Sequence, residues 1–149
     1  MRPIVRALRD ARGASIVEFA IVLPFLILCI AMLVDVGTGI SEQMRLKQAA
    51  QAGVNYAIDK GFDADKIIEV VRSSTDQPDI VVSPAPSKFC ACALESGLTE
   101  QICSAKCSSG NAPAEYVRVS TTFTHRRLIA LPGLDASYTL VSESRGRLK

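Results

Sequence analysis

Residues 13–34 read GASIVEFAIVLPFLILCIAMLV, and this stretch decides how the chain is organised. From residue 19 to residue 34 it carries no charged side chain. The 21 residues from Ala14 to Val34 would extend roughly 30 Å as an α-helix, which is the thickness of the hydrocarbon layer of a bilayer. We therefore expect a transmembrane helix over residues 14–36, after a leader of residues 1–13.

The charges that precede this stretch predict its orientation. Four arginines stand against one acidic residue in the leader, which gives it a charge of +3 (Arg2, Arg6, Arg9, Arg12 and Asp10). Positive charge is retained on the cytoplasmic side, so residues 37–149 should form a head outside the cytoplasm. Subtracting +3 from the whole-chain charge of +2 leaves −1 for residues 14–149. This balance does not predict a nucleic-acid partner.

Two other readings of the apolar stretch compete with a retained span. A cleaved secretory signal peptide has a shorter apolar region followed by small residues at the cleavage site. Gly37 and Gly39 would fit such a site. A core helix of a soluble protein would be less continuously apolar and less one-sidedly charged at its flank. Length and flanking charge favour a retained single-pass helix.

Glu18 is the one charged residue inside this stretch. A carboxylate in a lipid-exposed helix is costly unless it finds a partner, which makes Glu18 a candidate functional residue. The alternative is that Glu18 lies at the headgroup level and is solvated there. Its position alone does not separate these two interpretations.

Several features in order resemble one known family. Gly13, followed by four residues and then Glu18 and Phe19, resembles the cleavage signal of type IV prepilins. The Val17–Pro24 stretch, VEFAIVLP, and the following RLKQAAQAGVNYA at residues 45–57 are similar to TadE-like pseudopilins of tight-adherence (Flp) pilus systems.

This resemblance implies a set of roles and partners. A prepilin peptidase would cut between Gly13 and Ala14, and the new amino group of Ala14 would pair with Glu18 of a neighbouring subunit. Such pairing removes much of the cost of each charge in a low dielectric. The implied location is the bacterial inner membrane, with other pilins and pseudopilins, the peptidase, the assembly platform and the lipid bilayer as partners. Ala14 stands where many major pilins have Phe or Met, which leaves N-terminal methylation open.

The helical pattern continues beyond the span and becomes amphipathic. Small and apolar residues recur every three to four positions, which predicts a buried stripe against the protein's own sheet or against another subunit (Leu46, Ala49, Ala50, Gly53 and Ala57). Gly37 and Gly39 predict a bend above the membrane, because each glycine weakens a helix. Gly61 should end the helix, and Asp63 should cap a short second one.

The remaining chain predicts strands. We expect strands at residues 78–83, 116–124 and 136–143, with a turn at residues 131–134 and a frayed basic tail at residues 145–149. On the middle strand, alternation places Val117, Val119, Thr121 and Phe123 on one face. The predicted fold class is α+β, a long N-terminal helix packed on a small antiparallel sheet, as in pilins.

A cysteine-rich loop is expected at about residues 84–113. In an external head its cysteines predict two disulfides (Cys90, Cys92, Cys103 and Cys107). Cys90 and Cys92 are too close in sequence to pair well with each other, so a crossed and a nested pairing remain open. A zinc site is the alternative, but the spacing lacks the usual paired knuckles. We expect no metal and no cofactor.

The sequence favours a structural function. The single histidine, His125, stands near a strand end without a catalytic motif, and we expect it to be solvated. No catalytic residues are predicted. The chain is interpreted as a minor pilin-like subunit for assembly of an adhesive pilus. The alternative is a permanently anchored, cysteine-rich module that binds a metal or a partner outside any pilus.

Overall fold

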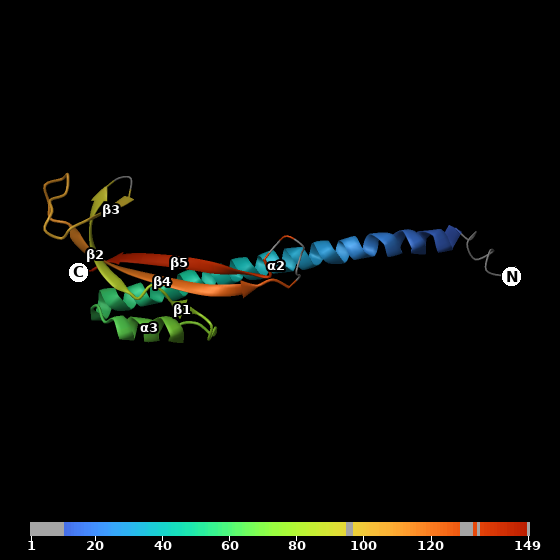
Figure 1. Cartoon of the computed structure of the whole chain (residues 1–149), viewed down its shortest axis with the longest axis horizontal. Coiled ribbons are helices and arrows are strands. Elements are labelled where there is room, and N and C mark those ends of the chain that lie inside the picture. The colour runs from blue at the N-terminus through green and yellow to red at the C-terminus, as the bar shows by residue number, and fades with distance from the viewer. Residues whose placement is uncertain (1–10, 95–96, 129–132, 134, 149) are drawn as a thin grey trace. The chain divides into compact units, whose positions relative to one another are not determined.

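The structure is a computed structural model that describes residues 11–94, 97–128, 133 and 135–148, with residues 11–14 described by their backbone alone. The chain forms two compact units. The first comprises residues 1–38 and 127–136, and the second comprises residues 39–126 and 137–149. The elements follow the order α2, α3, β1, β2, β3, β4 and β5 (Figure 1).

The long helix α2 spans Ala11–Lys60. The helix continues through Pro24, which lies inside it, and the helical backbone also continues through Gly37 and Gly39. A bend at these two glycines stays a prediction, because a continuous helical backbone does not exclude it. Gly39 has a different role, because a Cβ atom there would lie 2.5 Å from the hydroxyl oxygen of Tyr138 in β5.

The second half of α2 supplies the core of the second unit. The small-residue stripe is buried as expected, and it packs with α3, β4 and the residue preceding β1 (Leu46, Ala49, Ala50, Val54, Ala57, Ile67, Val71, Ile80, Val117 and Val119). Gly53 lets the elements approach closely, since a Cβ atom there would lie 2.7 Å from Cγ2 of Val71 and 3.3 Å from Cγ1 of Val119. The stripe is thus used for packing within the chain.

The signals around the helix end act as predicted. Gly61 has φ +93° and its N–H donates to the carbonyl of Ala57 at 3.1 Å, as in a left-handed C-cap. Helix α3 spans Ala64–Ser73, and the Asp63 side chain accepts a hydrogen bond from the N–H of Lys66 at 3.2 Å. This bond satisfies one of the free donors of the first helical turn.

In the described part of the chain, five antiparallel strands form one sheet around β4. They are β1 (Val81–Val82), β2 (Ser87–Leu94), β3 (Gly97–Gln101), β4 (Ala114–Arg126) and β5 (Ser137–Arg147). One edge of β4 pairs with β5 along almost its whole length, and the other edge pairs with β2 and then with β1. β3 extends the sheet beyond β2. Figure 1 shows the long β4–β5 pair beside the second half of α2.

The α+β prediction is confirmed, with three differences in the sheet. The segment at residues 84–113 that was expected to be a loop contains β2 and β3. The first expected strand is reduced to Val81–Val82. The expected frayed tail is wrong, because Arg145 and Arg147 belong to β5 and pair across to Arg118 and Tyr116.

Packing explains the extension of β5. A Cβ atom on Gly146 would collide with the side chains of Val54 and Ile58, so this glycine allows β5 to lie directly on α2. The N–H of Leu148 also donates to the carbonyl of Glu115 at 2.9 Å. Of the turn expected at residues 131–134, Gly133 alone is described, with φ +87°, and the other three lie outside the described residues.

Candidate functional site

The predicted processing and assembly residues lie in the first half of α2. Gly13 and Ala14 have helical backbone, and the side chain of Ala14 lies outside the described part of the structure. Glu18 is exposed, and Phe19 is 60% exposed. Glu18 makes no hydrogen bond or ion pair with any residue that the structure describes. Its carboxylate is thus available to a group from outside the chain.

The surface around Glu18 is apolar and uncovered. Ile16 is 70% exposed and Ile21 is 63% exposed. Within the described part of the chain, α2 is the one helix long and apolar enough to cross a membrane, and none of its most apolar window is buried. A core helix would be mostly buried, so that alternative does not fit.

Asp35 is the first charged residue after the apolar run, and it is 9% exposed. Its Oδ1 accepts a hydrogen bond from the N–H of Leu128 at 2.9 Å, and its Oδ2 lies 3.7 Å from Nη1 of Arg127. Both partners follow directly after β4. The carboxylate therefore ties the β4–β5 connection to α2 where the apolar run ends, a role that the sequence analysis missed.

The four head cysteines form two crossed disulfides. Cys90 bonds Cys103 with a Cα–Cα distance of 5.1 Å, and Cys92 bonds Cys107 with a Cα–Cα distance of 5.6 Å. Cys90 and Cys92 are two residues apart on β2, so their side chains point to the same face of the strand. Both therefore meet the segment after β3.

This pairing decides between the alternatives for the cysteines. The crossed connection is the one present, and the nested one is not. A four-cysteine zinc site would need all four sulfur atoms around one point, whereas here they are joined in two separate pairs. Nor do His, Cys, Asp and Glu side chains elsewhere in the described ranges gather as a metal-binding group.

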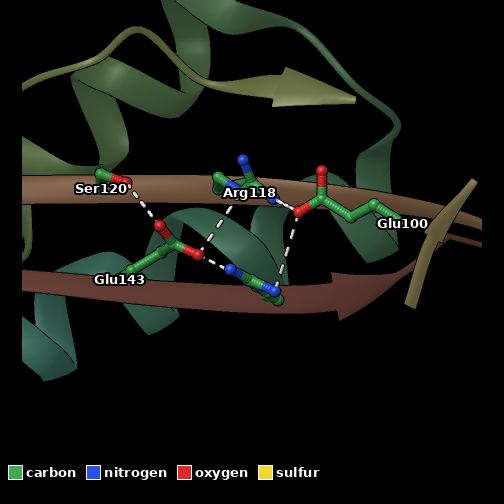
Figure 2. Close-up of polar contacts among 5 residues, drawn as sticks. Glu100, Arg118, Ser120 and Glu143 are labelled. Carbon is green, nitrogen blue, oxygen red and sulfur yellow. Dashed lines mark hydrogen bonds and ion pairs between the residues drawn. The ribbon is translucent and has the colours of Figure 1, made fainter. Parts of the chain in front are cut away.

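A network of two arginines and two glutamates covers the sheet face opposite α2 (Figure 2). Arg118 and Arg145 are directly opposite each other on β4 and β5, an arrangement that alone would be repulsive. Glu100 of β3 pairs with Arg118 and lies 3.9 Å from Nη1 of Arg145. Glu143 lies 3.4 Å from Nε of Arg118 and 2.5 Å from Nε of Arg145.

This Arg–Glu network links three strands. Ser120 donates to Glu143 at 3.5 Å, and the guanidinium of Arg118 lies 4.6 Å from the ring centroid of Phe89 on β2. Each glutamate lies between the two arginines and offsets their repulsion. The network thereby attaches the β2–β3 hairpin, with its disulfides, to the β4–β5 pair. Single-sequence reasoning had no signal for it, because these residues meet only through strand register.

His125 corrects the expectation of a solvated residue. It is 3% exposed, its Nδ1 lies 2.6 Å from Oε2 of Glu42, and its ring centroid lies 4.9 Å from that of Tyr138. The alternation of β4 explains the burial, because His125 continues the inward series of Val117, Val119, Thr121 and Phe123. The sequence pattern contained this signal, since extending the series by one step reaches position 125.

The geometry singles out the N-terminal part of α2, where an unpaired glutamate stands in an exposed apolar surface. Residues 13–55 match the model of the TadE-like protein family. The resemblance inferred from the sequence is confirmed over these residues. No curated protein and no solved structure matches the chain.

The TadE-like segment, residues 13–55, contains Gly13, Ala14, Glu18 and Phe19 together with the apolar run. It also contains Asp35, Glu42 and the first part of the buried stripe. It ends before α3 and the whole sheet, so the disulfides and the Arg–Glu network lie outside the matched part.

Proposed function

We propose that this chain is a minor pilin-like structural subunit that takes part in assembling a tight-adherence pilus for surface attachment. The observation that carries the proposal is the TadE-like match over residues 13–55, where Glu18 stands exposed in an apolar helix. TadE-like proteins are associated with Tad pilus systems. In this proposal the role is structural, with no catalytic step.

Maturation begins with cleavage of the leader between Gly13 and Ala14 by a prepilin peptidase. The product starts with a positively charged amino group four residues before Glu18. A second subunit, packed along the exposed apolar surface, would bring its own amino group to this carboxylate. Pairing the two charges offsets the cost of each in an apolar environment. Glu18 would thereby fix the alignment of neighbouring subunits during assembly.

The chain in this proposal is held in the bacterial inner membrane before assembly, with its leader in the cytoplasm. The arginines of the leader support this orientation. The two head disulfides also support it, because disulfides persist in oxidising compartments outside the cytoplasm. Partners are other pilins and pseudopilins of the same system, the prepilin peptidase, the assembly platform and the lipid bilayer.

Mass spectrometry of the protein from its native host tests the cleavage. We expect the mature chain to begin at Ala14. Gly13→Ala, or loss of the prepilin peptidase, should leave the leader attached. An intact Met1 terminus in a piliated strain would contradict the proposal.

Glu18→Gln tests the assembly role. The substitution removes the charge and keeps the shape, so we expect normal membrane insertion and cleavage but fewer pili and weaker co-purification with partner pilins. Glu18→Asp is the matched control and should restore part of the assembly. A normal number of pili in Glu18→Gln would contradict the assembly role. It would favour the two alternatives, a glutamate solvated at the headgroup level and an anchored module unrelated to a pilus.

Thiol alkylation tests the external location. Under non-reducing, denaturing conditions Cys29 alone should be labelled, because it is the free cysteine among the described residues. After reduction all five cysteines should be labelled. Labelling of all five without reduction would place the head in a reducing compartment.

A further inference from the structure

The connection between β4 and β5 is attached at a defined height on α2. The N–H of Leu128 donates to Oδ1 of Asp35 at 2.9 Å. Asp35 follows directly after the uncharged run of residues 19–34. Leu128 therefore lies at the level where the apolar surface of the helix ends, which is the outer edge of the hydrocarbon layer if the run spans a bilayer.

The position of Leu128 is set by several polar contacts of its neighbour. Arg127 donates from its backbone N–H to the carbonyl of Ala136 at 2.9 Å and from Nε to the carbonyl of Asp135 at 3.0 Å. Its Nη1 lies 3.7 Å from Oδ2 of Asp35. Both ends of the β4–β5 connection are thus fixed beside the helix.

The side chain of Leu128 is left uncovered. It is 63% exposed, although its backbone is held in place. Leu33 and Val36, on either side of Asp35 in the helix, are 73% and 59% exposed. The exposed leucine thus lies at the end of the uncovered apolar surface of α2, and a large exposed apolar surface marks a contact site for a membrane or a protein.

We infer that Leu128 is a second membrane contact of this chain, inserting into the outer interface of the bilayer beside the end of the span. The lipid is favoured as the occupant because the exposed leucine continues the apolar surface of the span at the same level. A contact on one side of the helix also selects one rotation of the helix about its axis. The inference rests on the membrane location in the proposed function.

Fluorescence quenching in vesicles tests this contact. Full-length protein carrying Cys29→Ala and Leu128→Cys would be labelled with a nitrobenzoxadiazole probe under non-reducing conditions. It would then be reconstituted into phosphatidylethanolamine–phosphatidylglycerol vesicles with a nitroxide on the lipid at shallow or deep positions. The matched control is Ile102→Cys, at a head residue that is 72% exposed. Leu26→Cys, within the span, reports membrane insertion.

We expect shallow nitroxides to quench the probe at position 128 at least threefold more than the probe at position 102. Deep nitroxides should quench the probe at position 26. Quenching at 26 with equal, weak quenching at 128 and 102 would overturn the inference and leave the span intact. Absence of quenching at 26 would overturn the membrane location itself, and with it the inference.

Asp35→Ala in the Leu128→Cys background tests the attachment. Losing the acceptor of the Leu128 N–H should reduce shallow quenching at position 128 by about half or more. Unchanged quenching would contradict the attachment of Leu128 through Asp35, from which the inference is argued, and would overturn it. Shielding of the probe that requires added partner pilins, and not lipid, would assign this surface to a neighbouring subunit and overturn the inference. Unchanged thermal unfolding of the head in each variant shows that the fold is intact.

Discussion

Residues 15–34 and residues 39–60 belong to the same helix, yet the more apolar half is the exposed one. Leu33 is 73% exposed, whereas Leu46 is completely buried. The first half is apolar on every side, as expected for a helix surrounded by lipid or by other apolar helices. The second half has a narrow stripe, and its buried positions are mainly alanine, glycine and valine.

Hydrophobicity and burial are therefore separate properties of this helix. Burial in the second half depends on close approach, which small side chains permit at Gly53, Ala49 and Ala50. None of the most apolar window of the first half is buried by the described part of its own chain, which leaves this surface for lipid or for another subunit. Its one carboxylate, Glu18, is unpaired there, whereas Glu42 in the second half contacts a buried histidine.

The largest expected difference comes from the same substitution in each half. Leu46→Ala creates a cavity between α2 and the sheet and should lower the free energy of unfolding of the head by about 2–5 kcal/mol. Leu33→Ala removes an exposed side chain and should change it by less than about 0.5 kcal/mol. Thermal unfolding of the full chain in detergent micelles measures both. Similar losses would mean that the first half is also packed within the chain.

The two glutamates provide a second matched pair. Glu42→Ala leaves His125, which is 3% exposed, without its carboxylate partner and should cost about 1–3 kcal/mol of head stability. Glu18→Ala should leave head stability unchanged, because Glu18 is exposed and makes no hydrogen bond or ion pair with described residues. The same unfolding assay reports both values. A destabilising Glu18→Ala would reveal a contact of the first half with the head.

The smallest expected effects come from two glycines, and they have opposite signs. Gly53→Ala places a methyl group 2.7 Å from Cγ2 of Val71, and overpacking of about 1–3 kcal/mol should outweigh the gain of about 1 kcal/mol in helix propensity. A Cβ atom added at Gly37 would meet no neighbouring atom within 4 Å. Gly37→Ala should therefore stabilise the helix by up to about 1 kcal/mol. If Gly53→Ala and Gly37→Ala changed the unfolding temperature equally, close packing around Gly53 would not be the reason for a glycine there.

The local elements were predictable because their signals lie within a few residues. The helix end at Gly61 and the cap at Asp63 were both predicted, since a left-handed residue and a side-chain acceptor each act over one turn. Polar segments between strands were harder. The hairpin of β2 and β3 lies in a serine- and alanine-rich segment, residues 84–113, that has no strong strand pattern. Its disulfides join it to the segment after β3, and Glu100 links it to Arg118 of β4.

The candidate roles of Gly13, Ala14, Glu18 and Phe19 came from the resemblance of the sequence to TadE-like pseudopilins. Local sequence patterns were enough to predict the apolar helix, its orientation signal and the small-residue stripe. These follow from composition and from spacing along one helix. The tertiary structure alone decided the crossed pairing of the cysteines, the burial of His125 against Glu42, and the attachment of Leu128 to Asp35. Each of these joins residues far apart in the chain, and such contacts depend on strand register and helix packing, which local patterns do not encode.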